Sequence, residues 1–453
     1  MKIAVLGAGI CGLSAAWKLA DSGADVEIIE KSSSAGGLAK SVKKYGCIFD
    51  YGAHGYHSNK KEILEIFKQL AGSFTVQAKN VKINFLGKYY KYPLEAFDLA
   101  KKLDPVLSVM CFLDFVKSRV KRRVFKKKDD SMEDWIVNRF GRKIYDIYFG
   151  PYSTKVWGVS PSRIAASFSE HRIPHSSLLE LALKSFSKGK GKITGKEHSY
   201  APLVVEFLYP EIGAGVIPEN ILLKIKEKNG RIHLNSNVKK IHEGEGGVKR
   251  IVYFENGRER EILCDGVIST IPVPELLGAI EPLPDRDVLS AASELKYRAI
   301  VFACLVVNRP SVIPAQSIYF TKKVFNRLSD MRKLGAVSAS PPSKTLIIAD
   351  IMCDKDDEIW NEKDEVICGH VIRDIEAEGF IRKGDVENSF TLRYEHGYPV
   401  YLKGYKENFD RITGYFGKTD NFLISGRQGL FKYVDMDLAM EMGFKCAEYF
   451  IRK

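Results

Sequence analysis

A glycine-rich stretch with a carboxylate behind it is the clearest sign of chemistry in this chain. Gly7, Gly9 and Gly12 have the spacing G-x-G-x-x-G, and Glu30 ends the next apolar segment. Gly7 permits a tight turn, Gly9 lets a pyrophosphate approach the backbone, and Gly12 lets a helix pack against a strand. A carboxylate at the position of Glu30 accepts hydrogen bonds from a ribose diol. The pattern predicts a dinucleotide site, and both NAD and FAD satisfy it.

The segments around these residues predict a strand–helix–strand unit. Residues 2–6 form a short apolar run without alternation, which is typical of a buried parallel strand. Apolar residues then recur at helical spacing from Ile10 to Leu19, and residues 25–30 predict a second strand. The N-terminus of such a helix offers unpaired N–H groups and a positive dipole end to phosphates.

Two further segments favour FAD. Gly36 and Gly37 form a second glycine pair just past the acidic residue, and Leu38 stands where a basic residue usually follows. This pair is similar to the extension found in FAD proteins of the glutathione reductase type, especially their amine-oxidase-like branch. Late in the chain, a strand over 422–427 runs into a glycine, and a helix begins at about Met436. FAD proteins of this class close their cofactor domain in this way.

Length and composition bound the protein class. A chain of 453 residues is too long for one ordinary core, so we expect two or three lobes. Its eight cysteines form no C-x-x-C pair, which predicts free, mostly buried thiols and no metal site. No apolar run reaches the roughly 20 residues needed to span a bilayer, and no secretory signal precedes the first strand. We therefore expect a cytoplasmic protein.

The net charge of +13 is compatible with nucleic acid, anionic lipid or an acidic small substrate. The densest basic patch is 117–128, for which a solvated helix face is the first interpretation. A peripheral membrane contact is the alternative, because the apolar residues 106–115 precede the patch. No nucleic-acid-binding motif is present, so we expect no nucleic-acid partner. The sequence leaves the oligomeric state open.

The periodicities predict an α/β fold with a discontinuous cofactor domain. We expect an FAD-binding domain over 1–75, 190–275 and 400–453, a helical lobe over 90–190, and a sheet-rich substrate lobe over 76–90 and 276–399. The predicted strands of the substrate lobe are 299–307, 317–320, 345–352 and 389–394.

Five separated blocks resemble one family. They are 50–54, 151–172, 207–216, 318–327 and 396–433. Together with the FAD motifs they are similar to the UDP-galactopyranose mutase branch of the amine-oxidase-like flavoproteins, and the larger eukaryotic-type mutases look closest. The resemblance implies a Rossmann-type, glutathione-reductase-like FAD-binding domain with a helical lobe and a β-sheet substrate lobe.

The resemblance also implies residue roles. His54 would place the flavin, and Arg172 and Arg327 would contact the substrate diphosphate, since a planar guanidinium suits phosphate oxygens. The implied substrate contacts are Trp157, Arg172, Tyr319, Arg327, Tyr398 and Tyr433. The implied cofactor contacts are Gly7, Gly9, Gly12, Glu30, Gly36, Gly37, Leu38, His54, Val238, Gly426, Arg427 and Met436. Trp157 serves equally well as a core residue, and each arginine as a surface charge.

The implied activity is the interconversion of the pyranose and furanose forms of a UDP-hexose. In the mutases, N5 of reduced FAD attacks the anomeric carbon and forms a flavin–sugar adduct as UDP leaves. A protoporphyrinogen-oxidase-like or amine-oxidase-like redox enzyme is the first alternative, because it shares every FAD block. A nucleotide-sugar or lipid-linked glycan binding protein with a structural FAD is the second. The sequence does not fix the sugar or the source of reducing equivalents.

Overall fold

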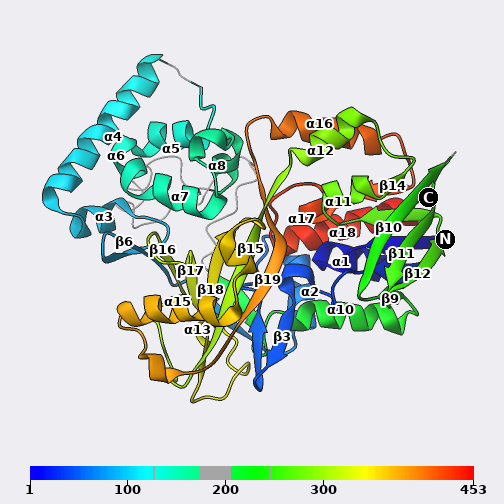
Figure 1. Ribbon diagram of the computed structural model, residues 1–453, viewed down its shortest axis with the longest axis horizontal. Coiled ribbons are helices and arrows are strands. Elements are labelled where there is room, and N and C mark those ends of the chain that lie inside the picture. Colours follow the sequence, from blue (N-terminus) through cyan, green and yellow to red (C-terminus); the bar gives the residue numbers. More distant parts are fainter. Residues whose placement is uncertain (126–127, 173–205, 245) are drawn as a thin grey trace.

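The computed structural model describes residues 1–125, 128–172, 206–244 and 246–453 (Figure 1). A five-stranded parallel sheet has the order β20–β13–β1–β2–β9. Its strands are β1 (Lys2–Leu6), β2 (Asp25–Ile29), β9 (Arg231–His233), β13 (Gly266–Ser269) and β20 (Phe422–Ile424). Helix α1 (Ile10–Asp21) packs between α10 (Val216–Glu227) and α18 (Met436–Ile451). This unit therefore joins both ends of the chain to its middle.

Strand β1 is apolar and buried from Ile3 to Leu6 because both faces of its sheet are covered. Ile3 and Val5 share a core with α1, α10 and α18. Ala4 and Leu6 point the other way, into a core shared with a second sheet. That four-stranded sheet, in the order β12–β11–β10–β14, consists of β10 (Ser236–Gly244), β11 (Gly247–Glu255), β12 (Arg258–Leu263) and β14 (Ile280–Glu281). Helices α11 (Val273–Gly278), α12 (Arg286–Ser293) and α16 (Tyr405–Phe416) pack beside it, and α17 (Gly426–Gly429) follows β20.

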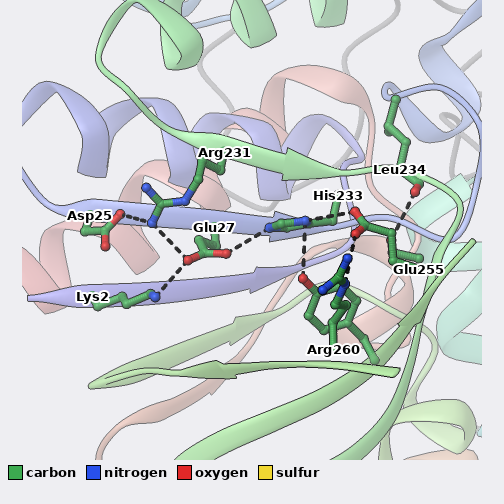
Figure 2. A network of polar contacts seen from close by, with 10 residues as sticks. Lys2, Asp25, Glu27, Arg231, His233, Leu234, Glu255 and Arg260 are labelled. Carbon is green, nitrogen blue, oxygen red and sulfur yellow. Dashed lines mark hydrogen bonds and ion pairs between the residues drawn. The ribbon is translucent and has the colours of Figure 1, made fainter. Parts of the chain in front are cut away.

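A network of charges joins the two sheets at the end of β2 (Figure 2). The buried carboxylate of Glu27 lies 2.8 Å from Lys2 Nζ, 2.9 Å from Arg231 Nη2 and 2.8 Å from His233 Nε2. His233 in turn lies 3.1 Å from Glu255 on β11. Burial alone would raise the pKa of Glu27, but hydrogen bonds from its three neighbours outweigh burial and lower that pKa to about 2.

A seven-stranded sheet forms the second large unit, in the order β19–β15–β18–β17–β16–β6–β7. Its strands are β6 (Val81–Phe85), β7 (Lys88–Lys91), β15 (Lys296–Val307), β16 (Ser317–Phe320), β17 (Arg327–Asp330), β18 (Thr345–Cys353) and β19 (Val386–Val400). Helix α15 (Asp364–Ala377) covers one face, and the short helices α13 (Met331–Leu334) and α14 (Glu358–Asn361) lie at its margins.

The other face of this sheet packs on two ribbons from the cofactor side. They pair β3 (Ser41–Lys44) with β4 (Cys47–Asp50) and β5 (Phe74–Ala78) with β8 (Glu206–Pro210). Phe49 on β4 and Tyr209 on β8 share a core with Phe302 on β15. Helix α2 (Lys61–Ala71) packs behind the second ribbon, against α10. These contacts fix the substrate side relative to the cofactor side.

The helical lobe follows β7 and is the most extended part of Figure 1. It comprises α3 (Ala96–Lys102), α4 (Pro105–Phe125), α5 (Met132–Phe140), α6 (Arg142–Ile144), a π-helical turn (Tyr145–Phe149), α7 (Gly150–Trp157) and α8 (Ala166–Arg172). Short 3₁₀ turns occur at Gly37–Ala39, Pro161–Arg163 and Lys383–Asp385.

The strand pairing differs from the predicted lobes in two places. β5 pairs with β8 rather than with the seven-stranded sheet, and β14 pairs with β10, so residues 76–78 and 280–281, which were predicted in the substrate lobe, pair with strands of the cofactor side. The predicted boundary at residue 190 lies outside the described residues, and the division into domains stays a prediction.

All eight cysteines are free and buried, as predicted. Among the described residues, no helix has the length and apolarity to cross a membrane.

Candidate active site

Each of the three glycines in the first turn has a different structural role. Gly7 has φ +94°, and a Cβ there would lie 2.6 Å from Thr270 Oγ1. A Cβ at Gly12 would lie 2.0 Å from the carbonyl oxygen of Gly7, so only glycine lets α1 approach β1 so closely. A Cβ at Gly9 would meet nothing within 4 Å. The space in front of Gly9 is thus open for a ligand at the N-terminus of α1.

Glu30 ends β2 beside this turn. Its carboxylate accepts hydrogen bonds from the backbone N–H of Ala8 at 2.7 Å and of Ser32 at 2.8 Å. These bonds hold the carboxylate between the first turn and the next loop. Glu30 and Val238 line the same cavity. This is the place predicted for a ribose contact.

The second glycine pair lies against the first glycine turn and lines the same cavity. Gly36 and Gly37 both have positive φ, and the N–H of Gly36 donates to the carbonyl of Ala8 at 2.8 Å. A Cβ at Gly37 would lie 3.2 Å from Gly9 Cα, so the two glycine turns touch. Leu38 and Lys40 both line the cavity, and burial lowers the pKa of Lys40.

One cavity of about 620 Å³ joins these turns to the seven-stranded sheet. It reaches from Glu30 and Val238 to Arg327, Tyr398 and Tyr433. The predicted cofactor residues that line it are Gly7, Gly9, Glu30, Gly36, Gly37, Leu38, His54, Val238, Gly426, Arg427 and Met436. Gly12 lies behind the wall, where it serves packing. Its lining residues come from widely separated parts of the chain, from Gly7 to Ala439.

His54 lies in the wall of the cavity as a neutral ring. Burial lowers its pKa to about 3, and the charges of Arg327 and Arg427 act in the same direction. Its Nε2 lies 2.9 Å from the carbonyl oxygen of Tyr51. Because a carbonyl oxygen only accepts, the single ring proton is on Nε2, and Nδ1 is a hydrogen-bond acceptor.

Arg327 enters the cavity from β17. Its Nε donates to Asp350 Oδ2 on β18 at 2.7 Å, and its Nη2 also pairs with that carboxylate. The two residues face each other across the strand pair, and both side chains are largely buried. Burial favours the neutral guanidine, but Asp350 outweighs burial and raises the pKa of Arg327 above its usual range. Arg327 is thus a fixed, permanent charge at the cavity wall.

Tyr398, Tyr433 and Arg427 form a stack at the same end. The two phenol rings are parallel, with centroids 5.3 Å apart. The Arg427 guanidinium lies 5.3 Å from the Tyr398 ring and 4.7 Å from the Tyr433 ring. It donates to the carbonyl oxygens of Val434 and Gly397, and within the described residues it forms no ion pair. Its charge is therefore held in place by carbonyls and rings alone.

The family model described as flavin containing amine oxidoreductase matches residues 10–387. The chain belongs to this family. It is 22% identical to coproporphyrinogen III oxidase of Staphylococcus aureus, over 92% of each chain. It is 23% identical to a probable UDP-galactopyranose mutase of Klebsiella pneumoniae over 178 residues, 38% of this chain and 45% of that protein.

The fold agrees with the family. The crystal structure of reduced UDP-galactopyranose mutase matches with a TM-score of 0.84 at 20% identity, covering 100% of this chain and 95% of that chain. The predicted α/β fold, with a Rossmann-type FAD-binding domain and a substrate lobe, is therefore confirmed. FAD is the cofactor of this flavoprotein, and the fit of the glycine turns and Glu30 to a dinucleotide agrees with it.

Two predicted substrate residues, Trp157 and Tyr319, do not line the cavity. Trp157 is buried behind Tyr398, with ring centroids 6.1 Å apart, so it has a packing contact with the site. Tyr319 lies opposite Arg327 in the β16–β17 hairpin, next to the cavity wall. Arg172 is the last residue of α8, and its side chain lies outside the described residues. The role of Arg172 stays a prediction.

Several residues at the site were missed from the sequence. Asp350 is the partner of Arg327, but only the pairing of β17 with β18 brings them together. Glu275, Glu395 and His396 also line the cavity, with ligand atoms within 4.8 Å of one another. They form ion pairs: Glu275 lies 3.5 Å from Lys31 and Glu395 lies 2.8 Å from Lys355. The available signal was that His396 opens the 396–433 block and that Glu395 directly precedes it.

Asp50 ties two of the family-like blocks together beneath the cavity. It is fully buried and accepts hydrogen bonds from Tyr209 Oη at 2.6 Å and from the N–H of Ala214 at 3.0 Å. Burial raises its pKa to about 6, although these hydrogen bonds act against that rise. The bond network holds the 50–54 loop, and with it His54, against β8.

Proposed function

We propose that this flavoprotein interconverts the pyranose and furanose forms of a UDP-linked hexose. The observation that carries the proposal is the charge at the end of the cavity beside His54. Two guanidinium groups, of Arg327 and Arg427, approach this end, and Asp350 is the one carboxylate paired with either of them among the described residues. An anionic ligand such as a diphosphate would balance the remaining positive charge.

The phenols fit the same ligand. Tyr398 lies within electrostatic reach of Arg327 and Arg427, and burial raises its pKa, so it stays protonated as a donor. Such a donor gives a directed hydrogen bond to a phosphate oxygen without adding charge. The stack of Tyr398 on Tyr433 fixes the direction of that bond. Arg172 would add a third guanidinium, from the helical lobe, as the resemblance implies.

The opposite end of the cavity suits FAD. The open space before Gly9 and the N-terminus of α1 would take the pyrophosphate, and Glu30 would take a ribose. When bound and reduced, FAD supplies the nucleophile for the anomeric carbon of the sugar. The protein would hold the leaving diphosphate through Arg327 and Tyr398. His54 would orient the flavin through the unprotonated Nδ1.

A second candidate is an FAD-dependent oxidation of a porphyrinogen. The observation that favours it is the similarity to coproporphyrinogen III oxidase, which extends over 92% of both chains. The mutase similarity in sequence covers less than half of the relative, whereas the similarity of fold to a mutase covers the whole chain. Both relatives are distant, so the discriminating property is the ligand that the cationic end of the cavity accepts.

The test is a titration of the FAD-loaded protein with UDP, in the oxidised and in the dithionite-reduced state. The flavin spectrum recorded at each UDP concentration is the readout. The proposal expects saturable UDP binding that is tighter in the reduced state, and conversion of a UDP-hexopyranose to its furanose by the reduced protein. Absence of UDP binding in both states, with oxygen uptake on coproporphyrinogen III, would establish the oxidase instead.

A further inference from the structure

Helix α4 presents an apolar face to the outside of the molecule. Figure 1 shows it along the outer edge of the helical lobe. Its exposed apolar side chains are Val106, Val109, Met110, Phe112, Leu113, Val116, Val120 and Val124. Phe112, Leu113 and Val120 are 63%, 61% and 57% exposed among the described residues. Scattered exposed apolar residues are ordinary, but a contiguous group of this size marks an interaction surface.

The spacing of these residues makes them one stripe. Val109, Leu113, Val116, Val120 and Val124 follow one another at intervals of three or four, which places them along one side of the helix. We call these five residues the outer stripe. The opposite side holds Cys111 and Phe115, which are buried in the core of the helical lobe. The helix is therefore anchored by one apolar side and exposes another.

The charges on α4 are arranged around the outer stripe. At about 100° per residue, Lys117 and Lys121 lie on one flank and Arg119 on the other, and all three are exposed. Asp114 is the one acidic residue of the helix. Its carboxylate accepts from the backbone N–H of Lys143 at 2.8 Å, so it faces the protein. The exposed side of α4 thus combines an apolar stripe with positive flanks and no negative charge.

We propose that α4 docks the protein on an anionic lipid bilayer. The helix would lie in the interfacial plane, with the outer stripe among the acyl chains and Lys117, Arg119 and Lys121 at the level of the phosphates. Charge complementarity selects this occupant. A second copy of the chain would bring like charges together, and a nucleic acid would leave the outer stripe unpaired. The docking surface does not depend on which reaction the flavin site catalyses.

The test uses the full-length, FAD-loaded protein and sedimentation with vesicles. One set of vesicles contains phosphatidylcholine alone, and the other contains phosphatidylcholine and phosphatidylglycerol in equal parts. We expect binding to the anionic set that weakens as salt is added. The double variant Leu113→Asp with Val120→Asp should bind at least about tenfold more weakly. The matched control is Leu223→Asp, an equally exposed leucine on α10, which should bind like the unaltered protein.

A second variant separates charge from apolar contact. Lys117→Gln with Lys121→Gln should lower binding by about fivefold per lysine and reduce its dependence on salt. The flavin content of every variant reports correct folding, because none of the changed residues lines the cavity. Absence of binding to anionic vesicles would overturn the proposal. So would a dimer in sedimentation velocity that the Leu113→Asp change dissolves, because it would assign the outer stripe to a second copy.

Discussion

Removal of Arg327 tests the proposed diphosphate contact, but its ion pair with Asp350 makes the simple variant ambiguous. Arg327→Ala leaves a largely buried carboxylate without a partner, which costs about 3–5 kcal/mol of unfolding free energy. The same change removes charge-assisted hydrogen bonds to the ligand, each of about 1.5–3 kcal/mol, so UDP affinity should fall about tenfold to hundredfold. A loss of stability alone would imitate a loss of binding.

The double variant Arg327→Ala with Asp350→Asn separates the two effects. We expect it to recover much of the stability lost by Arg327→Ala, because no charge is left unpaired. We expect UDP binding to stay weak, because the guanidinium is still missing. Asp350→Asn alone should keep UDP binding or tighten it, since Arg327 then lacks its counter-charge. Urea unfolding gives the stabilities, and titration of the reduced flavin spectrum gives the affinities.

Arg298 provides the matched control. It is a buried arginine paired with Asp354, it lies on β15, and it does not line the cavity. Arg298→Ala should therefore destabilise the protein, by less than Arg327→Ala because Asp354 keeps its ion pair with Lys296, while UDP affinity stays unchanged. Recovery of UDP affinity in the Arg327→Ala, Asp350→Asn double variant would refute the reasoning, because Arg327 would then act only as the structural partner of Asp350.

Three further predictions follow from the turns and the buried charges. Gly9→Val should fold but lack flavin, whereas Gly12→Val should be insoluble, as the flavin-to-protein absorbance ratio of the soluble fraction will show. Glu27→Gln should lower the unfolding free energy at neutral pH by up to about 3 kcal/mol. Because the folded-state pKa of Glu27 is depressed, this contribution is present above about pH 4.5 and is lost as the pH falls towards about 2, so urea unfolding of the two proteins should converge there. His54 should stay neutral, with its proton on Nε2, from about pH 5 to about pH 8, and imidazole nitrogen shifts in an NMR titration that show its protonation near pH 6.5 would contradict the structure.

The helices and strands of the cofactor side could be predicted from the sequence because the residues that specify them lie close together in the chain. The turn after β1 needs glycine at Gly7 and Gly12 for steric reasons that act within a few residues. The apolar run of β1 and the helical spacing of α1 are equally local. The helix predicted to begin at Met436 does begin there. Such features are visible without knowledge of the tertiary contacts.

The substrate side was predictable only in part because long-range pairing decides it. β16 spans the predicted residues, but β19 runs from Val386 to Val400 rather than over 389–394. Its additional residues include polar ones such as Glu395 and His396, which pair with charges from other segments instead of alternating with apolar residues. The pairing of Arg327 with Asp350 likewise depends on the register of β17 and β18, which no local pattern specifies.

The distinction between mutase and oxidase therefore rests on which anion the cavity accepts rather than on the fold. The fold accommodates relatives named for either activity, so the architecture of the sheets and helices is neutral between them. A buried guanidinium is costly unless a charge or a set of acceptors compensates it. Among the described residues, one carboxylate compensates Arg327, and carbonyl oxygens and two tyrosine rings compensate Arg427, which leaves excess positive potential at the cavity wall. A neutral apolar substrate would gain nothing from that potential, whereas the diphosphate of UDP or the carboxylates of coproporphyrinogen III would. The strength of UDP binding with and without Arg327 therefore measures what this charge contributes to a diphosphate, and oxygen uptake on coproporphyrinogen III tests the other anion.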